Sequence, residues 1–411
     1  MDISHLSDFP DRISPMLVKE LRQGMRAKTF VGVFLALQIF LAIMLFSASA
    51  ASAASQVGGV VSGVILGFFA LAVLVVQPMR GTNALASEVR GQTIDMMVLT
   101  RLSSWRIVFG KWFAIVSQSA LLLSAIIPYL ILRYFFGGMN FVGEIVLLVL
   151  LFLTSMALTA VTVGLSGCTS VIIRSLIPVL GLPLLAFLLL NLAFERGASS
   201  ELIEICSLDS ESSRIGVLFY VFSIIYVGYS MLSLGASLIA PAAENHAIFR
   251  RLLALGLLTI AAFVGFFGKA QEGVFWLMVG VITMPAVIIA LVESGPLVQT
   301  VCQPFVKRGI IGRFAGVFLY PTWTSGVIFA VVLTTLSLSL MLFGYELFTP
   351  RWAPSETDEE EAIAILAIAG GLFFPTLWQL FMFKGEGQRL AHYMLLLVGS
   401  YVLLLILTIL T

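Results

Sequence analysis

The side chains best suited to a specific contact lie in one polar stretch, residues 80–106, between two long apolar segments. Thr93 can cap a short helix over residues 94–99, with Asp95 in the first turn, where the helix dipole favours an acid. Ser103 can cap the helix that follows. A short helix between two bends, with methionines for an adaptable apolar contact, is suited to docking a soluble partner. Met96, Met97 and Leu99 are available for such a contact.

The usual groups for catalysis and metal binding form no recognisable site in the sequence. The histidines are His5, His246 and His392, and none is paired with a nearby acid or cysteine at catalytic or metal-ligand spacing. The cysteines form no C-x-x-C pair and are expected to be small apolar residues in helices. An intramembrane enzyme stays open as an alternative, but we expect neither a catalytic residue nor a metal site. The three cysteines are Cys168, Cys206 and Cys302.

An ATP-binding loop of the G-x-x-x-x-G-K-[ST] type is also missing from the sequence. The two Gly-Lys pairs end at Lys111 and Lys269, and they are followed by Trp112 and Ala270 in place of Ser or Thr. The chain therefore cannot hydrolyse ATP by that route.

Apolar helices must position the polar stretch. Hydrophobic residues make up 60% of the 411 residues, charged residues make up 11%, and the mean hydropathy is +1.06. A soluble domain has roughly 25% charged residues, so this chain needs lipid as a solvent, where helices or a closed barrel must satisfy the backbone. Its apolar runs are long and unbroken, unlike barrel strands. We therefore predict an all-α, polytopic transmembrane helical bundle. A net charge of +1 excludes the basic field that a nucleic-acid partner would need.

Eleven segments approach the roughly 20 apolar residues that one membrane span requires. The first follows basic residues and ends in small ones, as a signal peptide does. Its long apolar run and long leader favour an uncleaved anchor instead. The predicted spans lie near residues 30–48, 57–77, 110–132, 142–165, 171–194, 216–240, 250–268, 273–292, 325–345, 362–382 and 391–410.

The basic residues predict the orientation of these spans, because inner loops are enriched in Lys and Arg. With the N-terminus in the cytoplasm, only five of the 23 Lys and Arg residues fall in outer segments. If one span were missing or wrongly counted, every later inner loop would become an outer loop. The uneven distribution of Lys and Arg therefore also supports the total of eleven spans. We therefore predict a cytoplasmic N-terminus and an outer C-terminus at Thr411. The five outer basic residues are Arg133, Arg196, Arg214, Lys269 and Arg351.

Residues 14–28 predict a basic amphipathic helix just before the first span. Ser14 can cap this helix, and Pro15 suits its first turn. Leu17, Leu21 and neighbouring apolar residues fall on one face. Such a helix lies in the inner membrane interface, although a positive flank that only fixes topology is an open alternative. The charged residues of the predicted helix include Lys19, Glu20, Arg22 and Arg26.

Both polar stretches resemble parts of the permeases of type-two ABC exporters. The segment from Pro15 to Gln23 resembles their elbow helix. The polar loop resembles their coupling loop and its flanks through Glu88, Arg90, Gly91, Thr93, Ile94, Asp95, Leu99, Thr100, Leu102, Ser103, Ile107, Gly110 and Lys111. The chain departs from the family pattern at Arg101, where proline is common, and at Arg90, where a second acid is frequent.

The resemblance implies a function and partners. It implies a permease subunit in a bacterial inner membrane that exports its substrate by alternating access. A separate ABC ATPase subunit would carry ATP and Mg and dock at residues 80–106. The ATPase-coupling residues that the resemblance implies are Glu88, Arg90, Thr93, Asp95, Met96, Met97, Thr100 and Ser103. A second permease chain, identical or related, would complete the complex.

Three parts are predicted along the chain. Residues 1–29 form a cytoplasmic tail with the elbow helix, and residues 30–241 form a six-span permease core. Residues 242–411 form an additional five-span bundle, with a long inner loop at 293–325 that contains several prolines. This loop follows the second span of its half, as the polar loop does in the first half, so a degenerate parallel repeat is an alternative to an added bundle. The basic residues of the long inner loop are Lys307, Arg308 and Arg313.

A secondary transporter is the main alternative function, and a membrane scaffold without an ATPase is another. Secondary transporters usually hold carboxylates deep in their spans, whereas Glu144, Glu293 and Glu346 are expected near span ends. The deeper polar residues are uncharged, so we expect helix-packing hydrogen bonds or, alternatively, a substrate pathway. These residues are Gln38, Gln118 and Asn191.

Overall fold

The chain is built from helices. The structure, a computed structural model, describes residues 15–50, 57–91, 103–134, 140–168, 181–183, 185–187, 189, 202–204, 206–241, 244–267, 272–293, 295 and 297–348. Every regular element in these residues is a helix, which confirms the predicted all-α class.

Two compact units make up the chain, and each is described by itself. Unit 1 comprises Met1–Cys168 and Arg174–Ala236, and unit 2 comprises Thr169–Ile173 and Ser237–Thr411. The predicted boundary between residues 241 and 242 lies a few residues from this division. The roles given to the two parts stay predictions.

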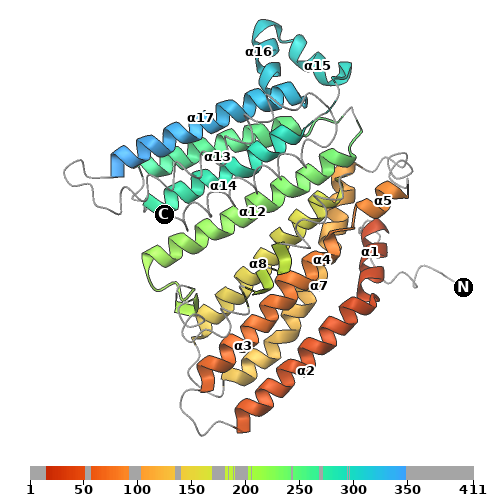
Figure 1. The fold of residues 1–411 in the computed structure, drawn as a ribbon, viewed down its shortest axis with the longest axis vertical. Helices are drawn as coiled ribbons and strands as arrows, with labels where there is room; N and C mark the ends of the chain where they lie inside the picture. The colour runs from red at the N-terminus through yellow and green to blue at the C-terminus, as the bar shows by residue number, and fades with distance from the viewer. Residues whose placement is uncertain are drawn as a thin grey trace, which may run out of the picture. The chain divides into compact units, whose positions relative to one another are not determined.

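Unit 1 consists of long helices that run alongside one another, with short helices at one end of the bundle (Figure 1). The long apolar runs form these helices because intrahelical hydrogen bonds satisfy the backbone without water. The last residues of α12 belong to unit 2. The helices are α1 (Pro15–Met25), α2 (Lys28–Ala50), α3 (Val57–Leu71), η2 (Ala72–Val76), α4 (Gln77–Gly81), α5 (Ala86–Arg90), α7 (Ser104–Tyr134), α8 (Phe141–Ser166) and α12 (Glu211–Ile239).

The core of unit 1 lies where apolar faces of α2, α3 and α7 meet. Leu41, Phe69 and Leu122 are fully buried in this core. Other apolar side chains of α2 point outward, and Ile39 and Phe46 are 60% and 78% exposed. A helix that is apolar on every side fits a lipid surrounding, because only one of its faces can pack on the protein.

A π-helical turn, η2, joins α3 to α4. The i→i+5 pattern of such a turn disturbs the regular hydrogen bonding of the helix and often marks a functional position. Ser155 of α8 donates its hydroxyl to the carbonyl oxygen of Val73 in this turn at 2.7 Å, and the bond is buried. The π-turn is therefore held by a side chain from a neighbouring helix.

Small residues bring α8 and α12 close together. A Cβ added to Gly164 would lie 2.2 Å from the carbonyl oxygen of Met231, and one added to Gly235 would lie 2.9 Å from Cα of Gly164. Helices in lipid associate through close backbone packing of this kind, because apolar side chains gain little by leaving lipid.

In the residues that the structure describes, unit 2 contains the long helices α13, α14 and α17 side by side, with a short helical hairpin at one end (Figure 1). A Cβ on Gly326 of α17 would lie 1.9 Å from the carbonyl oxygen of Ala290 in α14, so these two helices pack at backbone distance. Phe275 and Phe329 are buried in this unit. The helices are α13 (Ala247–Phe267), α14 (Glu272–Val292), α15 (Gln299–Val306), α16 (Gly309–Leu319) and α17 (Trp323–Phe348).

Several described helices are long and apolar enough to cross a membrane. Five meet both requirements, and three shorter apolar helices accompany them. These helices are compatible with a multi-pass membrane protein, while the total of eleven spans and the orientation stay predictions. The predicted spans at 362–382 and 391–410, and most of 171–194, lie outside the described residues. The five long segments are Lys28–Ser47, Ser104–Leu132, Phe141–Ser166, Ser213–Ile239 and Trp323–Met341.

Candidate functional site

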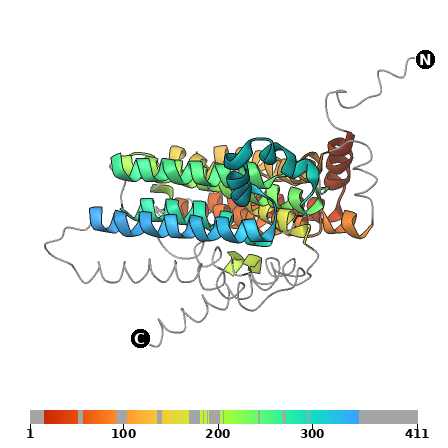
Figure 2. The same ribbon diagram turned by 90° about the horizontal axis from the view of Figure 1, so that it is seen from above.

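A buried lysine joins three helices of unit 1. Lys111, near the start of α7, is only 5% exposed. Its ammonium group donates to Glu20 Oε1 of α1 at 3.0 Å and to Glu88 Oε1 of α5 at 3.1 Å. Figures 1 and 2 show α1 and α5 at the same end of unit 1. We call Glu20, Glu88 and Lys111 the lysine junction.

The lysine junction is largely shielded from water. The side chains of Glu20 and Glu88 are 20% and 15% exposed, and that of Lys111 is 6% exposed. Coulomb attraction is stronger at such a place than on an open surface, because less solvent screens it. Two carboxylates share one ammonium, so removal of the lysine would leave two acids without this shared counter-charge.

A second cation also holds α1 against the bundle. Arg80 of α4 donates from Nη2 to the carbonyl oxygen of Gly24 at 3.3 Å. Its guanidinium also lies over the ring of Phe30, 5.8 Å from the centroid. Gly24 is near the end of α1, where a cation is favourable, and its carbonyl oxygen also accepts the backbone N–H of Ala27 at 3.3 Å.

The close approach of α1 to α7 depends on a glycine. A Cβ on Gly24 would lie 2.0 Å from Nε2 of Gln118, so a larger residue would displace this side chain. Gln118 is 1% exposed. Its predicted role as a packing residue or a pathway residue remains open, but the structure places it against α1. Among the other predicted pathway residues, Gln38 is half-buried on α2, and Asn191 lies outside the described residues.

The structure brings together only part of the predicted contact stretch. Glu88 points toward Lys111, whereas Arg90 at the end of α5 is exposed. Ser103 precedes α7, and its carbonyl oxygen accepts the backbone N–H groups of Arg106 and Ile107. The remaining predicted residues lie outside the described part of the chain: Thr93, Asp95, Met96, Met97 and Thr100.

The helix predicted ahead of the first span is present as α1, while its role as an elbow helix stays a prediction. It begins at Pro15, as the helix-start signals predict, and it ends at Met25. Lys19, Arg22 and Arg26 are exposed, while Glu20 is turned toward Lys111. The exposed side of α1 is therefore basic, and its acidic residue Glu20 pairs with Lys111 of the bundle.

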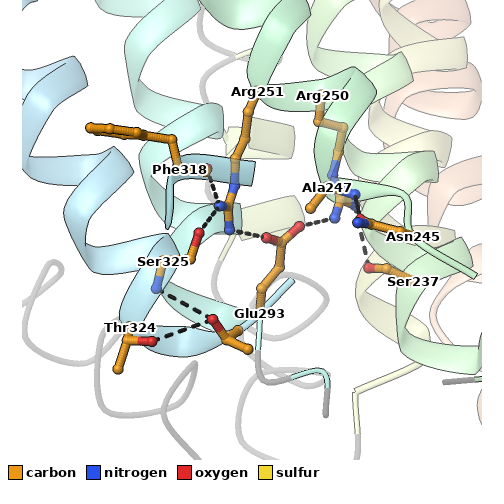
Figure 3. Close-up of polar contacts among 10 residues, drawn as sticks. Ser237, Asn245, Ala247, Arg250, Arg251, Glu293, Phe318, Thr324 and Ser325 are labelled. Carbon is orange, nitrogen blue, oxygen red and sulfur yellow. Dashed lines mark hydrogen bonds and ion pairs between the residues drawn. The ribbon is translucent and has the colours of Figure 1, made fainter. Parts of the chain in front are cut away.

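Unit 2 contains its own buried charge cluster (Figure 3). Glu293, just after α14, accepts a hydrogen bond from Arg250 through one carboxylate oxygen. Its other oxygen accepts from Arg251 at 2.5 Å. All three side chains are at most 7% exposed. We call Arg250, Arg251 and Glu293 the arginine cluster.

The arginine cluster ties together the ends of several helices in unit 2. Arg251 also donates to the carbonyl oxygen of Phe318 at 2.5 Å and to the hydroxyl of Ser325 at 2.8 Å. Its guanidinium lies 5.4 Å from the ring centroid of Phe329. Because these partners belong to α16 and α17, one side chain of α13 fixes both helices.

The sequence alone does not predict this cluster. The charge distribution places Arg250 and Arg251 in an inner segment, and Glu293 is expected near a span end. A signal was available, because both arginines and the glutamate were predicted at the ends of neighbouring spans on the same membrane face. Opposite charges at such places tend to pair when they are buried.

One histidine does meet an acid. His246 Nε2 lies 3.1 Å from Glu244 Oε2, a contact between near neighbours in the chain. Both side chains are partly exposed, and no third metal ligand joins them within the residues that the structure describes. This pair therefore does not constitute a metal centre.

No protein-family model matches this chain, and neither the curated proteins nor the solved structures contain a significant match. The sequence pattern and the geometry of the lysine junction are therefore the two features that bear on function.

Proposed function

We propose that this chain is the membrane-spanning permease of an ATP-driven exporter, powered by a separate ABC ATPase subunit. The resemblance of α1 and the polar loop to the elbow and coupling segments of type-two exporters suggests this function. A permease without an ATP-binding loop needs a mechanical path from a docking site to its spans. The lysine junction is the observation that supports such a path.

The lysine junction can transmit movement of the polar loop. α5 lies at the start of that loop, and Glu88 attaches α5 to Lys111 at the base of the long helix α7. The same ammonium holds Glu20 of α1. A displacement of α5 would therefore pull on α1 and α7 together.

The proposed cycle follows from this connection. ATP would close two ATPase subunits, and their movement would shift the polar loops of two permease chains. The spans would then rock between inward-facing and outward-facing arrangements, as rigid bodies do in other alternating-access proteins. A secondary transporter or a scaffold would need no ATPase at the polar loop.

Photo-cross-linking in native membranes tests the proposed docking. A benzophenone amino acid would replace Met96 or Met97, which the sequence predicts to face the ATPase. We expect both positions to capture an ABC ATPase. The matched control is Ile39 on α2, which is 60% exposed on an apolar helix and should capture no such subunit. Failure to capture an ATPase from Met96 and Met97 would refute the docking site.

A second measurement tests the coupling path. Spin labels at Lys19 of α1 and Val149 of α8, both exposed, would report the distance between α1 and a helix outside the lysine junction. We expect ATP to change this distance in the complex, and the change to disappear in Lys111→Met but persist in Lys111→Arg. A distance that responds to ATP equally in both variants would exclude the lysine junction as the path.

A further inference from the structure

The short helix α16 presents bulky apolar side chains to its surroundings. Ile310, Ile311 and Phe314 are 86%, 85% and 70% exposed. Their positions i, i+1 and i+4 place them on one face of a helix with 3.6 residues per turn. Single exposed apolar residues are common, but a contiguous group of this size marks an interaction surface.

The opposite face of α16 is fixed against the protein. A Cβ on Gly312 would lie 2.0 Å from the carbonyl oxygen of Phe305 in α15, and one on Gly316 would lie 2.6 Å from the ring of Tyr320. Gly312 and Gly316 lie roughly half a turn away from the apolar group. The helix therefore cannot rotate to bury Ile310 and Phe314 without breaking this packing.

Only positive charge accompanies the apolar face. Between residues 294 and 322 the charged residues are Lys307, Arg308 and Arg313, with no aspartate or glutamate. All three are exposed. A surface that combines bulky apolar groups with cations and no acids complements an anionic lipid interface.

The hairpin of α15 and α16 also lies where a membrane surface is expected. It connects the end of α14 to the start of α17, and both of these helices are apolar. Trp323 opens α17, and tryptophan is typical of the membrane–water boundary. The bond from Arg251 to the carbonyl oxygen of Phe318 anchors the end of α16 to the bundle at this level.

We propose that the α15–α16 hairpin is a binding site for anionic phospholipid. Ile310, Ile311 and Phe314 enter the boundary between headgroups and acyl chains, while the three cations contact lipid phosphates. Continuity with two membrane helices and the lack of acidic residues favour a lipid over a protein partner. The site does not depend on an ATPase and extends beyond the proposed transport function.

Depth measurements on the full-length protein in lipid nanodiscs test the site. In a cysteine-free background (C168A, C206A, C302S), an environment-sensitive fluorophore would be attached through Ile311→Cys. We expect a blue-shifted emission and protection from aqueous quenchers in discs with phosphatidylglycerol, and less of both in pure phosphatidylcholine. Gln303→Cys on exposed α15 serves as the matched label position and should stay accessible to the quencher.

Charge removal provides the second arm. Each basic residue near an anionic surface is worth about a fivefold change in partitioning, so K307Q/R308Q/R313Q should remove most of the dependence on phosphatidylglycerol. The control R214Q removes an exposed charge elsewhere and should leave the lipid response of the label unchanged. Equal immersion of the label in both lipids, or an unaltered lipid response in the triple variant, would overturn the proposal. Protection that requires an added protein would also overturn it, in favour of a protein partner.

Discussion

Lys111 bonds two carboxylates, those of Glu20 and Glu88, through its single ammonium group. At 5% exposure the lysine has little access to water. An ion pair of this kind adds modest net stability, since desolvation offsets the attraction. Breaking it from one side is much more costly, because the remaining charges keep their burial and lose their partner.

Lys111→Met should therefore lower the free energy of unfolding by roughly 3 kcal/mol, the cost of leaving buried charge uncompensated. Thermal unfolding of the purified protein in detergent, followed by tryptophan fluorescence, measures the change. The triple variant K111M/E20Q/E88Q should recover much of the loss, because the two side chains that Lys111 bonds are then neutral. If the triple variant is no more stable than K111M, the charges of the junction do not interact as the distances indicate.

The thiol of Cys206 gives a pH-dependent prediction. Burial raises the pKa of this thiol above its ordinary value. A smaller fraction is therefore thiolate at any given pH, and the rate of alkylation should keep rising at pH values where a free thiol has levelled off. Iodoacetamide labelling of the C168A/C302S variant between pH 7 and about 10, compared with the same chain unfolded in denaturant, tests this. Coincident pH profiles for the folded and unfolded chains would contradict it.

At the scale of elements, close backbone contacts decide where the short helices can sit. α16 approaches α15 at Gly312, where no space remains for a Cβ. Gly256 in α13 offers a contrast, since a Cβ there would meet nothing within 4 Å. Substitution of Gly312 therefore tests tight packing, whereas substitution of Gly256 tests helix propensity alone.

Gly312→Ala should destabilise the hairpin by roughly 1–3 kcal/mol, the usual cost of overpacking. Gly256→Ala should be neutral or stabilise the protein by up to about 1 kcal/mol, because alanine favours a helix. Limited proteolysis at the hairpin, together with thermal unfolding, measures both effects. Equal protease resistance in the two variants would show that α15 and α16 are not packed at backbone distance.

Elements differed in how far the sequence could predict them. α1 was predicted from a capping serine, Pro15 and the period of its apolar residues, all of which are local signals. The long inner loop at 293–325, in contrast, contains the helices α15 and α16. Its prolines suggested irregular chain, and only contacts such as that between Phe305 and Gly312 show how the two helices are held.

At the scale of the whole molecule, the basic residues predict how the chain is oriented across the membrane. The distribution of Lys and Arg predicts that the loop before α12 is outside and the polar loop after α4 is in the cytoplasm. Asp209 and Arg90 are exposed residues in or beside these two loops. They offer a matched pair of positions for a test.

In a cysteine-free background, D209C should react with a membrane-impermeant maleimide in intact spheroplasts. R90C should react only after the membrane is permeabilised, because the reagent cannot cross lipid. Gel-shift detection of the labelled protein measures both. The reverse pattern would show that the predicted topology is inverted. Labelling of both positions from outside would show that an even number of spans lies between them, contrary to the prediction.

Composition and hydropathy by themselves determined that this chain is helical and contains long apolar segments, because every backbone group in lipid must be satisfied within its own segment. The pairing of charges was decided only by the tertiary structure. Glu20 meets Lys111 across 91 residues, and Arg251 meets Glu293 across 42. Such pairs depend on which helices pack together and how each is rotated about its axis. An apolar run that is hydrophobic on all sides carries almost no information about that rotation.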